Sequence, residues 1–372
     1  MNAQQPTYVF AGGGTGGHLA PAIAVAEYLA TAHPHAKVLF ACTDRAIDRR
    51  VLEPTGYGMV PQPVQPFPRR PLQAPGFLLA WLRSKALARQ LIRDVQPAAV
   101  VGLGGFAAGP LVRVAASQGV RTALLNPDAV PGKANQYLAR HVEAIFTQFP
   151  ATAEWFPVDV RSKVRMIGCP IRAKVLGADR AEAMAELGLA PQLKTLMITG
   201  GSLGAQTINE AVLANMDFLA SRATHWQVLH ITGPGKSQEA QRAYRAAGVR
   251  HVVMDFCDRM GFAYAASDLV IARAGANTVA ELTASGSPAL LLPYPFHRDQ
   301  HQRHNAEGMA QAGAAVLVND SADAIANART MRAALEGLLD DFPRLERMAR
   351  ASAELGRPGA AAVVGEWLIG GG

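Results

Sequence analysis

Short apolar runs recur along the first half of the chain, and segments with helical periodicity separate them. The runs lie at residues 8–11, 38–42, 98–103, 121–125 and 164–170. The segment from about 18 to 30 reads as a helix between the first two runs. Strands that alternate with helices in this way predict a parallel, doubly wound α/β sheet.

The same pattern restarts in the second half. Further runs lie at residues 194–199, 226–232, 251–255, 268–272 and 289–292, with a helix expected over 205–219. A hinge is expected near Pro170, because proline continues neither a strand nor a helix easily. We therefore expect two Rossmann-like domains, at 1–171 and 172–349, that face each other across a cleft. The last helical stretch, about 350–368, is expected to pack back on the first domain.

Composition and charge narrow the class of protein. With 49% hydrophobic and 17% charged residues, the chain can bury a sizeable core, and its three dispersed cysteines are typical of reduced thiols in a cytoplasmic protein. The sequence shows neither a membrane-spanning run nor a signal-peptide pattern. Residues 1–171 carry 17 Lys and Arg against 9 Asp and Glu, whereas residues 172–372 carry 19 against 20. The basic half indicates an anionic partner, but zinc-finger spacing and basic recognition helices, the usual signs of nucleic-acid binding, are missing.

Two glycine turns in the first half are candidate anion sites. Residues 12–17 link a predicted strand to a helix, where backbone N–H groups can approach a phosphate at the helix N-terminus. His18 follows in the first helical turn and could orient or deprotonate a hydroxyl, although a plain capping histidine is the alternative. Asp44 ends the next strand, as a ribose-binding acid does in a dinucleotide fold. The second turn, 102–109, could grip a diphosphate together with the first, or be a close-packed crossover.

The second half has a third glycine turn and a more specific motif. Residues 200–205 place Ser202 at a helix N-terminus. Residues 273–281 read Arg-Ala-Gly-Ala-Asn-Thr-Val-Ala-Glu, in which a strand passes into a helix and Glu281 follows about one turn later. That carboxylate could accept both hydroxyls of a ribose. The alternative is a capping box in which Glu281 reaches back to Thr278.

Two further segments carry candidate chemistry. His297, His301 and His304 have the spacing of a metal site on a helix, but no Cys or second acidic cluster supports zinc, and Gln302 and Asn305 are better read as partners of sugar hydroxyls. No Asp-x-Asp occurs, so a divalent metal has no obvious carboxylate ligands. Residues 67–93 combine aromatic and basic side chains at helical spacing, which favours an interfacial patch for anionic lipid over an ordinary surface helix. The proposed patch is Phe77, Trp81, Lys85 and Arg89.

These motifs together resemble the MurG family of peptidoglycan glycosyltransferases, in glycosyltransferase family 28. The matching segments are Gly-Gly-Thr-Gly-Gly-His at 13–18, Gly-Leu-Gly-Gly-Phe at 102–106, Gly-Gly-Ser-Leu-Gly-Ala at 200–205, the 273–281 motif and Asp-Gln-His-Gln-Arg-His-Asn-Ala at 299–306. They span nearly the whole chain in the family's order. The resemblance implies a GT-B fold and an inverting transfer of N-acetylglucosamine (GlcNAc) from UDP-GlcNAc to lipid-linked N-acetylmuramyl-pentapeptide. It implies no metal and no cofactor.

The resemblance also implies a set of site residues. Those expected to contact UDP-GlcNAc are Thr15, Gly16, Gly17, Asp128, Arg172, Ser202, Cys257 (through its backbone at the uracil), Ala276, Asn277, Thr278, Val279, Ala280, Glu281 and Gln302. Those expected at the diphosphate of the undecaprenyl-linked acceptor are Gly14, Thr15, Gly104 and Gly105. The patch would rest on the cytoplasmic face of the cell membrane, as in a peripheral protein.

The chain departs from the family pattern at two places in the first half. Leu125-Asn126-Pro127-Asp128 stands where the family usually has His-Glu-Gln-Asn, and Phe106 stands where Tyr is typical. His18 is the first candidate for the base that deprotonates the acceptor, and Asp128 is the second. A sister transferase with another lipid acceptor and a UDP-sugar 2-epimerase stay open as alternatives. A dehydrogenase or a nucleotide-sugar sensor fits the repeated glycine turns less well.

Overall fold

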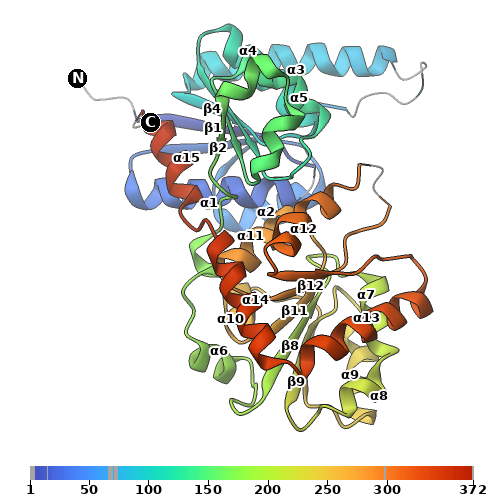
Figure 1. Ribbon diagram of the computed structural model, residues 1–372. Coiled ribbons are helices and arrows are strands. Elements are labelled where there is room, and N and C mark those ends of the chain that lie inside the picture. The colour runs from blue at the N-terminus through green and yellow to red at the C-terminus, as the bar shows by residue number, and fades with distance from the viewer. Residues whose placement is uncertain (1–4, 15, 66–69, 71–73, 297–298, 371–372) are drawn as a thin grey trace. The chain divides into compact units, whose positions relative to one another are not determined.

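The computed structural model describes residues 5–14, 16–65, 70, 74–296 and 299–370, and the chain divides into two compact units. Residues 1–172 and 358–372 belong to the first unit, and residues 173–357 to the second. Each unit has one parallel sheet with helices on both faces (Figure 1), so the predicted pair of doubly wound α/β domains is confirmed.

The first unit has a sheet in the order β3-β2-β1-β4-β5-β6-β7. Its strands are β1 (Thr7–Ala11), β2 (Lys37–Cys42), β3 (Gly58–Pro61), β4 (Ala99–Gly102), β5 (Arg121–Asn126), β6 (Ala144–Thr147) and β7 (Val164–Met166). Its helices are α1 (Gly16–Ala32), α2 (Ala46–Leu52), α3 (Ala74–Val95), α4 (Gly105–Ser117), α5 (Lys133–Leu138) and α15 (Ala360–Ile369).

Strand β1 shows why the apolar runs in this unit are nearly continuous. Tyr8 and Phe10 join a core that includes side chains of α1 and α15, while Val9 and Ala11 join a second core with α3 and α4. Successive side chains of a strand point to opposite faces, and here both faces are covered. A parallel sheet of this kind therefore needs apolar residues at every position of its central strands.

The second unit repeats the architecture with the sheet order β10-β9-β8-β11-β12-β13. Its strands are β8 (Lys194–Thr199), β9 (Trp226–Ile231), β10 (His251–Met254), β11 (Leu269–Ala272), β12 (Ala289–Leu291) and β13 (Ala315–Leu317). Its helices are α6 (Arg180–Glu186), α7 (Gln206–Leu213), α8 (Met216–Ala220), α9 (Ser237–Ala246), α10 (Met260–Ala265), α11 (Ala276–Ala284), α12 (His301–Gln311), α13 (Ala324–Leu339) and α14 (Phe342–Leu355).

One predicted helix of this unit is interrupted. The segment 205–219 forms α7 and α8, which are separated near Asn215. The buried Asn215 side chain donates hydrogen bonds to the carbonyl groups of Ala211 and Ala328, at 2.8 and 2.9 Å. An asparagine that satisfies itself on nearby backbone in this way favours a helix break over continuation.

The C-terminal helical stretch is divided between the two units. Helix α14 ends at Leu355 within the second unit, and α15 packs against α1 in the first. A Cβ atom at Gly365 would lie 2.3 Å from the Tyr28 ring, so only glycine permits this helix contact. The buried Trp367 lies edge-on to Phe146, with ring centroids 5.7 Å apart. Of the stretch predicted over 350–368, the part that packs in the first unit is therefore α15.

Candidate active site

In the first unit, three turns gather where neighbouring parallel strands end. Strands β1, β4 and β5 are adjacent, so the turns that follow them lie at one edge of the sheet. A Cβ atom at Gly105 would lie 3.2 Å from the Gly13 carbonyl oxygen and 3.6 Å from His18 Nδ1. Gly105 also has φ +69°, a conformation that favours glycine. The two glycine turns predicted from the sequence therefore lie side by side, with His18 in the first turn of α1 next to them.

A buried carboxylate organises the first of these turns. Asp48 on α2 accepts hydrogen bonds from the Gly14 amide at 2.8 and 2.9 Å and from the Thr43 amide at 3.0 Å. A Cβ atom at Gly13 would lie only 2.4 Å from Asp48 Oδ2. The Gly14 amide is thus engaged with Asp48, and the contact of Gly14 with the acceptor diphosphate remains a prediction. Thr15 lies outside the described residues, and Gly16 and Gly17 begin α1.

The ends of β2 and β5 place the acidic residues of this region. Asp44, which a dinucleotide site would use at the ribose, is exposed and pairs with Arg49. Asn126 is buried and donates to the Asp128 carbonyl at 2.7 Å, and Asn126 Oδ1 accepts from Asn135 at 2.9 Å. Asn126 therefore shapes the loop that carries the half-buried Asp128. Leu125 belongs to the core, so the departure from the family's polar residues at 125 and 126 is accommodated by packing and by an internal hydrogen bond.

Arg172 is engaged within the first unit. Its Nε donates to Glu27 Oε1 on α1 at 2.8 Å, and its terminal nitrogen donates to the same oxygen. Both side chains are about one-third exposed. A phosphate ligand of Arg172 would therefore compete with, or add to, the Glu27 carboxylate.

Helix α3 carries the predicted membrane patch. Phe77 stacks on Trp81 with ring centroids 6.2 Å apart, and the Trp81 ring packs on α4, where a Cβ atom at Gly109 would lie 3.1 Å away. Both aromatic side chains are half-buried, and the missing side chain of Gly109 makes room for the indole. The exposed apolar residues of α3 are Leu78, Leu79 and Leu82, each about half exposed. Lys85 is partly exposed and Arg89 is exposed, as expected for the basic part of the patch.

In the second unit, the turns after β8 and β11 are neighbours at the same edge of the sheet. Gly204 has φ +72°, and a Cβ atom there would lie 2.2 Å from the Thr232 carbonyl oxygen. This contact seats the glycine loop directly against the turn after β9. Ser202 lies exposed in the loop, before α7 begins at Gln206.

Helix α11 presents its N-terminus at this edge. The helix begins at Ala276, and Gly275 precedes it without a side-chain cap. The amides of the first turn, at Ala276, Asn277 and Thr278, point out of the N-terminal end of the helix, where the helix dipole favours an anion. The Val279 amide already donates to Gly275 at 2.9 Å, and the Val279 and Ala280 side chains are buried. The contacts of residues 276–281 with UDP-GlcNAc remain predictions.

Glu281 does not form the capping box. Its carboxylate accepts a hydrogen bond from the Tyr264 hydroxyl at 2.8 Å, in place of bonds to the amides of the first turn. Burial raises the pKa of Glu281 to about 7 from an ordinary value of 4.5, and the hydrogen bond from Tyr264 opposes this rise. A carboxylate held in a costly environment next to an anion-binding helix end is typical of a functional site.

A buried ion pair that no sequence pattern predicted supports the turn before α11. Arg273 lies 2.8 Å from Asp320 and donates to the Leu292 carbonyl at 2.9 Å and to Thr207 Oγ1 at 2.7 Å. Both ion-pair partners are almost fully buried. Arg273 thus joins β11, β12 and α7 and acts as a structural residue, although it stands in the motif at 273–281.

The polar cluster around α12 also holds this turn in place. Asn305 is buried and donates to the Ala274 carbonyl at 3.2 Å, and Gln302 Oε1 accepts from the Tyr294 amide at 2.9 Å. His301 pairs with Asp299, and His304 with Glu307. His297 lies outside the described residues, and within the described part of the chain no group of three His, Cys, Asp or Glu could hold a metal.

Cys257 lies after β10 and its side chain is buried. Burial raises the pKa of its thiol, so the side chain is unreactive at neutral pH. Any contact with a base would come from its backbone, and that contact remains a prediction.

Comparison with known proteins places the chain in a family. The glycosyltransferase family 28 N-terminal domain matches residues 8–147 and the family 28 C-terminal domain matches residues 195–364. The UDP-N-acetylglucosamine–N-acetylmuramyl-(pentapeptide) pyrophosphoryl-undecaprenol N-acetylglucosamine transferase of Halothermothrix orenii is 36% identical over 359 residues, which cover 95% of each chain. The chain belongs to the MurG family of glycosyltransferases.

Solved structures agree with the family assignment. The crystal structure of Acinetobacter baumannii MurG superposes with a TM-score of 0.75 at 26% identity and covers 98% of this chain and 99% of that one. A UDP-GlcNAc 2-epimerase from Neisseria meningitidis matches with a TM-score of 0.65 at 15% identity, over 98% and 99% of the two chains, which shows a shared fold alone. Within the described residues, no helix is long and apolar enough to cross a membrane.

The raised pKa of Glu281 gives a testable dependence of stability on pH. The folded protein holds a proton that the unfolded chain releases between about pH 4.5 and 7, so stability falls as pH rises through this window. Glu281→Gln removes the ionisation and should stabilise the protein by about 2 kcal/mol more at pH 8 than at pH 5. Urea unfolding followed by circular dichroism measures the difference. Glu210→Gln, an exposed carboxylate on α7, should show no such difference, and an effect of Glu281→Gln that is independent of pH would contradict the assignment.

Proposed function

We propose that this glycosyltransferase transfers GlcNAc from UDP-GlcNAc to the C4 hydroxyl of undecaprenyl-diphosphate-linked N-acetylmuramyl-pentapeptide, the step from lipid I to lipid II in peptidoglycan synthesis. Membership of the MurG family supports this assignment. The observation in the structure that carries it is the N-terminus of α11, which has no side-chain cap, with Glu281 about one turn further along, beside the glycine loop after β8.

The second unit would hold the donor. The amides of Ala276, Asn277 and Thr278 would bind the diphosphate, with Ser202 as a further donor from the neighbouring loop. Glu281 would accept the ribose hydroxyls, the backbone of Cys257 would meet the uracil, and Gln302 would face the sugar. As the bond to the anomeric carbon breaks, negative charge develops on the departing UDP. The helix end, together with Arg172, would stabilise that charge without a metal ion.

The first unit would hold the acceptor. The adjoining turns at Gly104 and Gly105 and at the start of α1 would bind the lipid diphosphate, while the Asp48 carboxylate fixes the backbone of the first turn. The acceptor hydroxyl would displace UDP directly, so the configuration at the anomeric carbon inverts. Its proton would pass to His18, or to Asp128 as the second candidate.

A transfer assay tests the function. The full chain is incubated with labelled UDP-GlcNAc and detergent-solubilised lipid I, and the lipid fraction is analysed for the disaccharide product. We expect label in lipid II and stoichiometric release of UDP. Label transferred only to another polyprenyl or glycerolipid acceptor would refute the acceptor assignment, and conversion of UDP-GlcNAc to its 2-epimer without an acceptor would refute the transferase assignment.

Two substitutions test the base. His18→Ala should lower kcat by roughly 10²–10⁴-fold, the range for loss of general base catalysis, while Asp128→Asn should retain turnover. Single-turnover rates with donor bound measure the chemical step. If Asp128→Asn is the inactive variant and His18→Ala is active, the base is Asp128.

Helix α3 would bind the cytoplasmic face of the cell membrane. The exposed Leu78, Leu79 and Leu82 would extend the patch of Phe77, Trp81, Lys85 and Arg89, so that it pairs apolar insertion with attraction to anionic lipid. Such a contact would bring the first unit to its lipid-linked acceptor.

Vesicle sedimentation tests this contact. The double variant Leu79→Glu, Leu82→Glu should lose binding to phosphatidylglycerol vesicles and keep transfer to a short-chain soluble acceptor. Val158→Glu, at an apolar residue of the first unit that is 78% exposed but lies off α3, should bind as the unmodified protein does. Equal binding by all three proteins would exclude α3 as the membrane contact.

A further inference from the structure

Tyr264 is the direct neighbour of the carboxylate that the donor needs. It lies on α10, is only 3% exposed, and donates its hydroxyl hydrogen to Glu281 Oε2 at 2.8 Å. The helix itself is seated tightly, since a Cβ atom at Gly261 would lie 2.5 Å from the Lys174 carbonyl oxygen. The tyrosine hydroxyl is therefore held at a defined place against Glu281.

In this hydrogen bond, Tyr264 is the donor and Glu281 is the acceptor. Burial, and then the nearby carboxylate of Glu281, raise the pKa of Tyr264 well above its ordinary value, so the hydroxyl keeps its proton and acts as a donor. A carboxylate has about four acceptor positions on its two oxygens. The bond from Tyr264 occupies one of them and leaves Oε1 and part of Oε2 for a vicinal diol.

The rotation of a glutamate carboxylate about its last bond is otherwise loosely defined. A fixed donor on one oxygen removes that freedom and selects the orientation of the other oxygen. It also favours the ionised acceptor form, which burial alone disfavours. Both effects prepare Glu281 to accept two hydroxyl groups at once.

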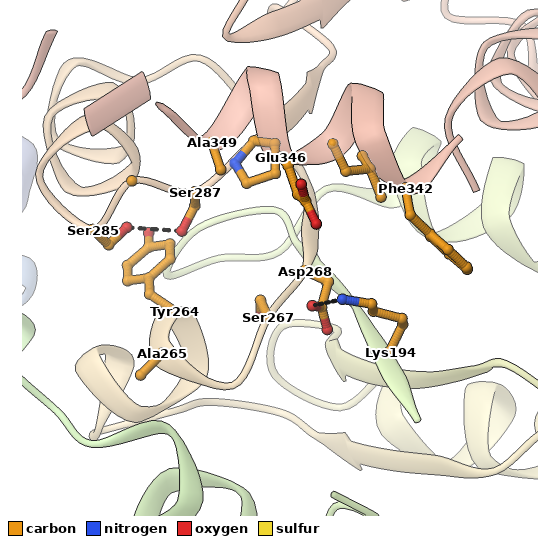
Figure 2. A pocket seen from close by; sticks show the side chains of 13 residues that line it. Lys194, Tyr264, Ala265, Ser267, Asp268, Ser285, Ser287, Phe342, Glu346 and Ala349 are labelled. Atoms are coloured by element: carbon orange, nitrogen blue, oxygen red, sulfur yellow. Dashed lines mark hydrogen bonds and ion pairs between the residues drawn. The ribbon is translucent and has the colours of Figure 1, made fainter. Parts of the chain in front are cut away.

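The position of the Tyr264 side chain depends on its hydroxyl bond as well as on packing. Figure 2 shows the Tyr264 side chain in the wall of a cavity of about 190 Å³, together with Ser285 and Ser287. Ser285 Oγ is engaged with Ser287 Oγ at 2.8 Å and with the Glu281 carbonyl at 2.7 Å. The tyrosine ring thus has open space on one side, and its bond to the Glu281 carboxylate fixes the position of its outer end.

We propose that Tyr264 is a positioning residue that orients Glu281 for the ribose diol and thereby sets the preference of the enzyme for a ribonucleotide over a 2′-deoxyribonucleotide donor. This inference rests on the proposed use of UDP-GlcNAc. Tyr264 touches no reacting atom and acts only through Glu281.

The test compares UDP-GlcNAc with dUDP-GlcNAc, which lacks the ribose 2′ hydroxyl, in steady-state transfer to lipid I. In Tyr264→Phe the KM for UDP-GlcNAc should rise about tenfold, the effect of one hydrogen bond to a charged group, with kcat within about twofold. The KM for dUDP-GlcNAc should change far less, so the ratio of the two kcat/KM values should fall by several-fold. A tyrosine with a purely structural role would lower both kcat/KM values equally.

Tyr244→Phe is the matched control. Tyr244 is also fully buried in the second unit, and its hydroxyl faces His230 Nδ1 at 2.9 Å. Its loss should leave the donor preference unchanged. Glu281→Asp tests the same contact from the other partner. The shorter side chain withdraws the carboxylate from Tyr264, whose hydroxyl is unchanged, so the preference for UDP-GlcNAc over dUDP-GlcNAc should fall in the same way.

The outcomes separate the two proposals. If the unmodified protein transfers GlcNAc and Tyr264→Phe keeps the donor preference of the unmodified protein, the role of Tyr264 is overturned and the transferase function stands, whatever Glu281→Asp does. If the unmodified protein transfers no GlcNAc from either donor, the proposed function fails and the inference fails with it.

Discussion

Both candidate sites depend on backbone segments that approach each other more closely than a Cβ atom would permit. In the first unit, a Cβ atom at Gly12 would lie 2.6 Å from Leu103 Cβ in the second turn, and in the second unit, a Cβ atom at Gly204 would lie 2.2 Å from the Thr232 carbonyl oxygen. Parallel strands end at a common edge, so turns from neighbouring strands meet there, but only glycine lets them touch. This contact brings the backbone amides and helix N-termini of neighbouring strand–helix turns together on one surface. The phosphate-binding capacity proposed for each unit follows from that surface.

Close backbone contact alone does not fix the conformation of a turn. Each unit also has buried charged side chains that hydrogen-bond to the turn or to the segments next to it. Asp48 accepts the Gly14 amide in the first unit, while the Arg273–Asp320 pair ties the turn before α11 to the neighbouring strand and helix in the second. Buried charges are expensive unless fully hydrogen-bonded, and these are satisfied by several partners. These charged residues build the site, whereas Ser202 and Glu281 are the residues that would contact a substrate.

The difference between residues that build the site and residues that would contact a substrate also explains which features could be predicted from the sequence. Most strands, the parallel doubly wound class and the glycine turns could be predicted, because apolar periodicity and glycine placement are local properties. Strands β3, β6 and β13 lie outside the predicted apolar runs. The break at Asn215 could not, since it depends on the Ala328 carbonyl of a distant helix. Likewise, the motifs do not indicate that Arg273 donates to the Leu292 carbonyl, that Asn305 donates to the Ala274 carbonyl, or that Trp81 packs at Gly109. Such roles depend on partners far along the chain, which no spacing rule identifies.

Glu281 shows how the site and the stability of the fold are linked. Burial makes its ionised form unfavourable, and the fixed hydroxyl of Tyr264 offsets only part of that penalty. A ligand that donates further hydroxyl hydrogens would supply the missing partners, so ionisation and binding would become favourable together. The free protein would therefore hold the carboxylate in a strained state that a diol relieves. Under the proposed function, this coupling would link donor binding to the ionisation of Glu281, whose position is set by the hydrogen bond between α10 and α11.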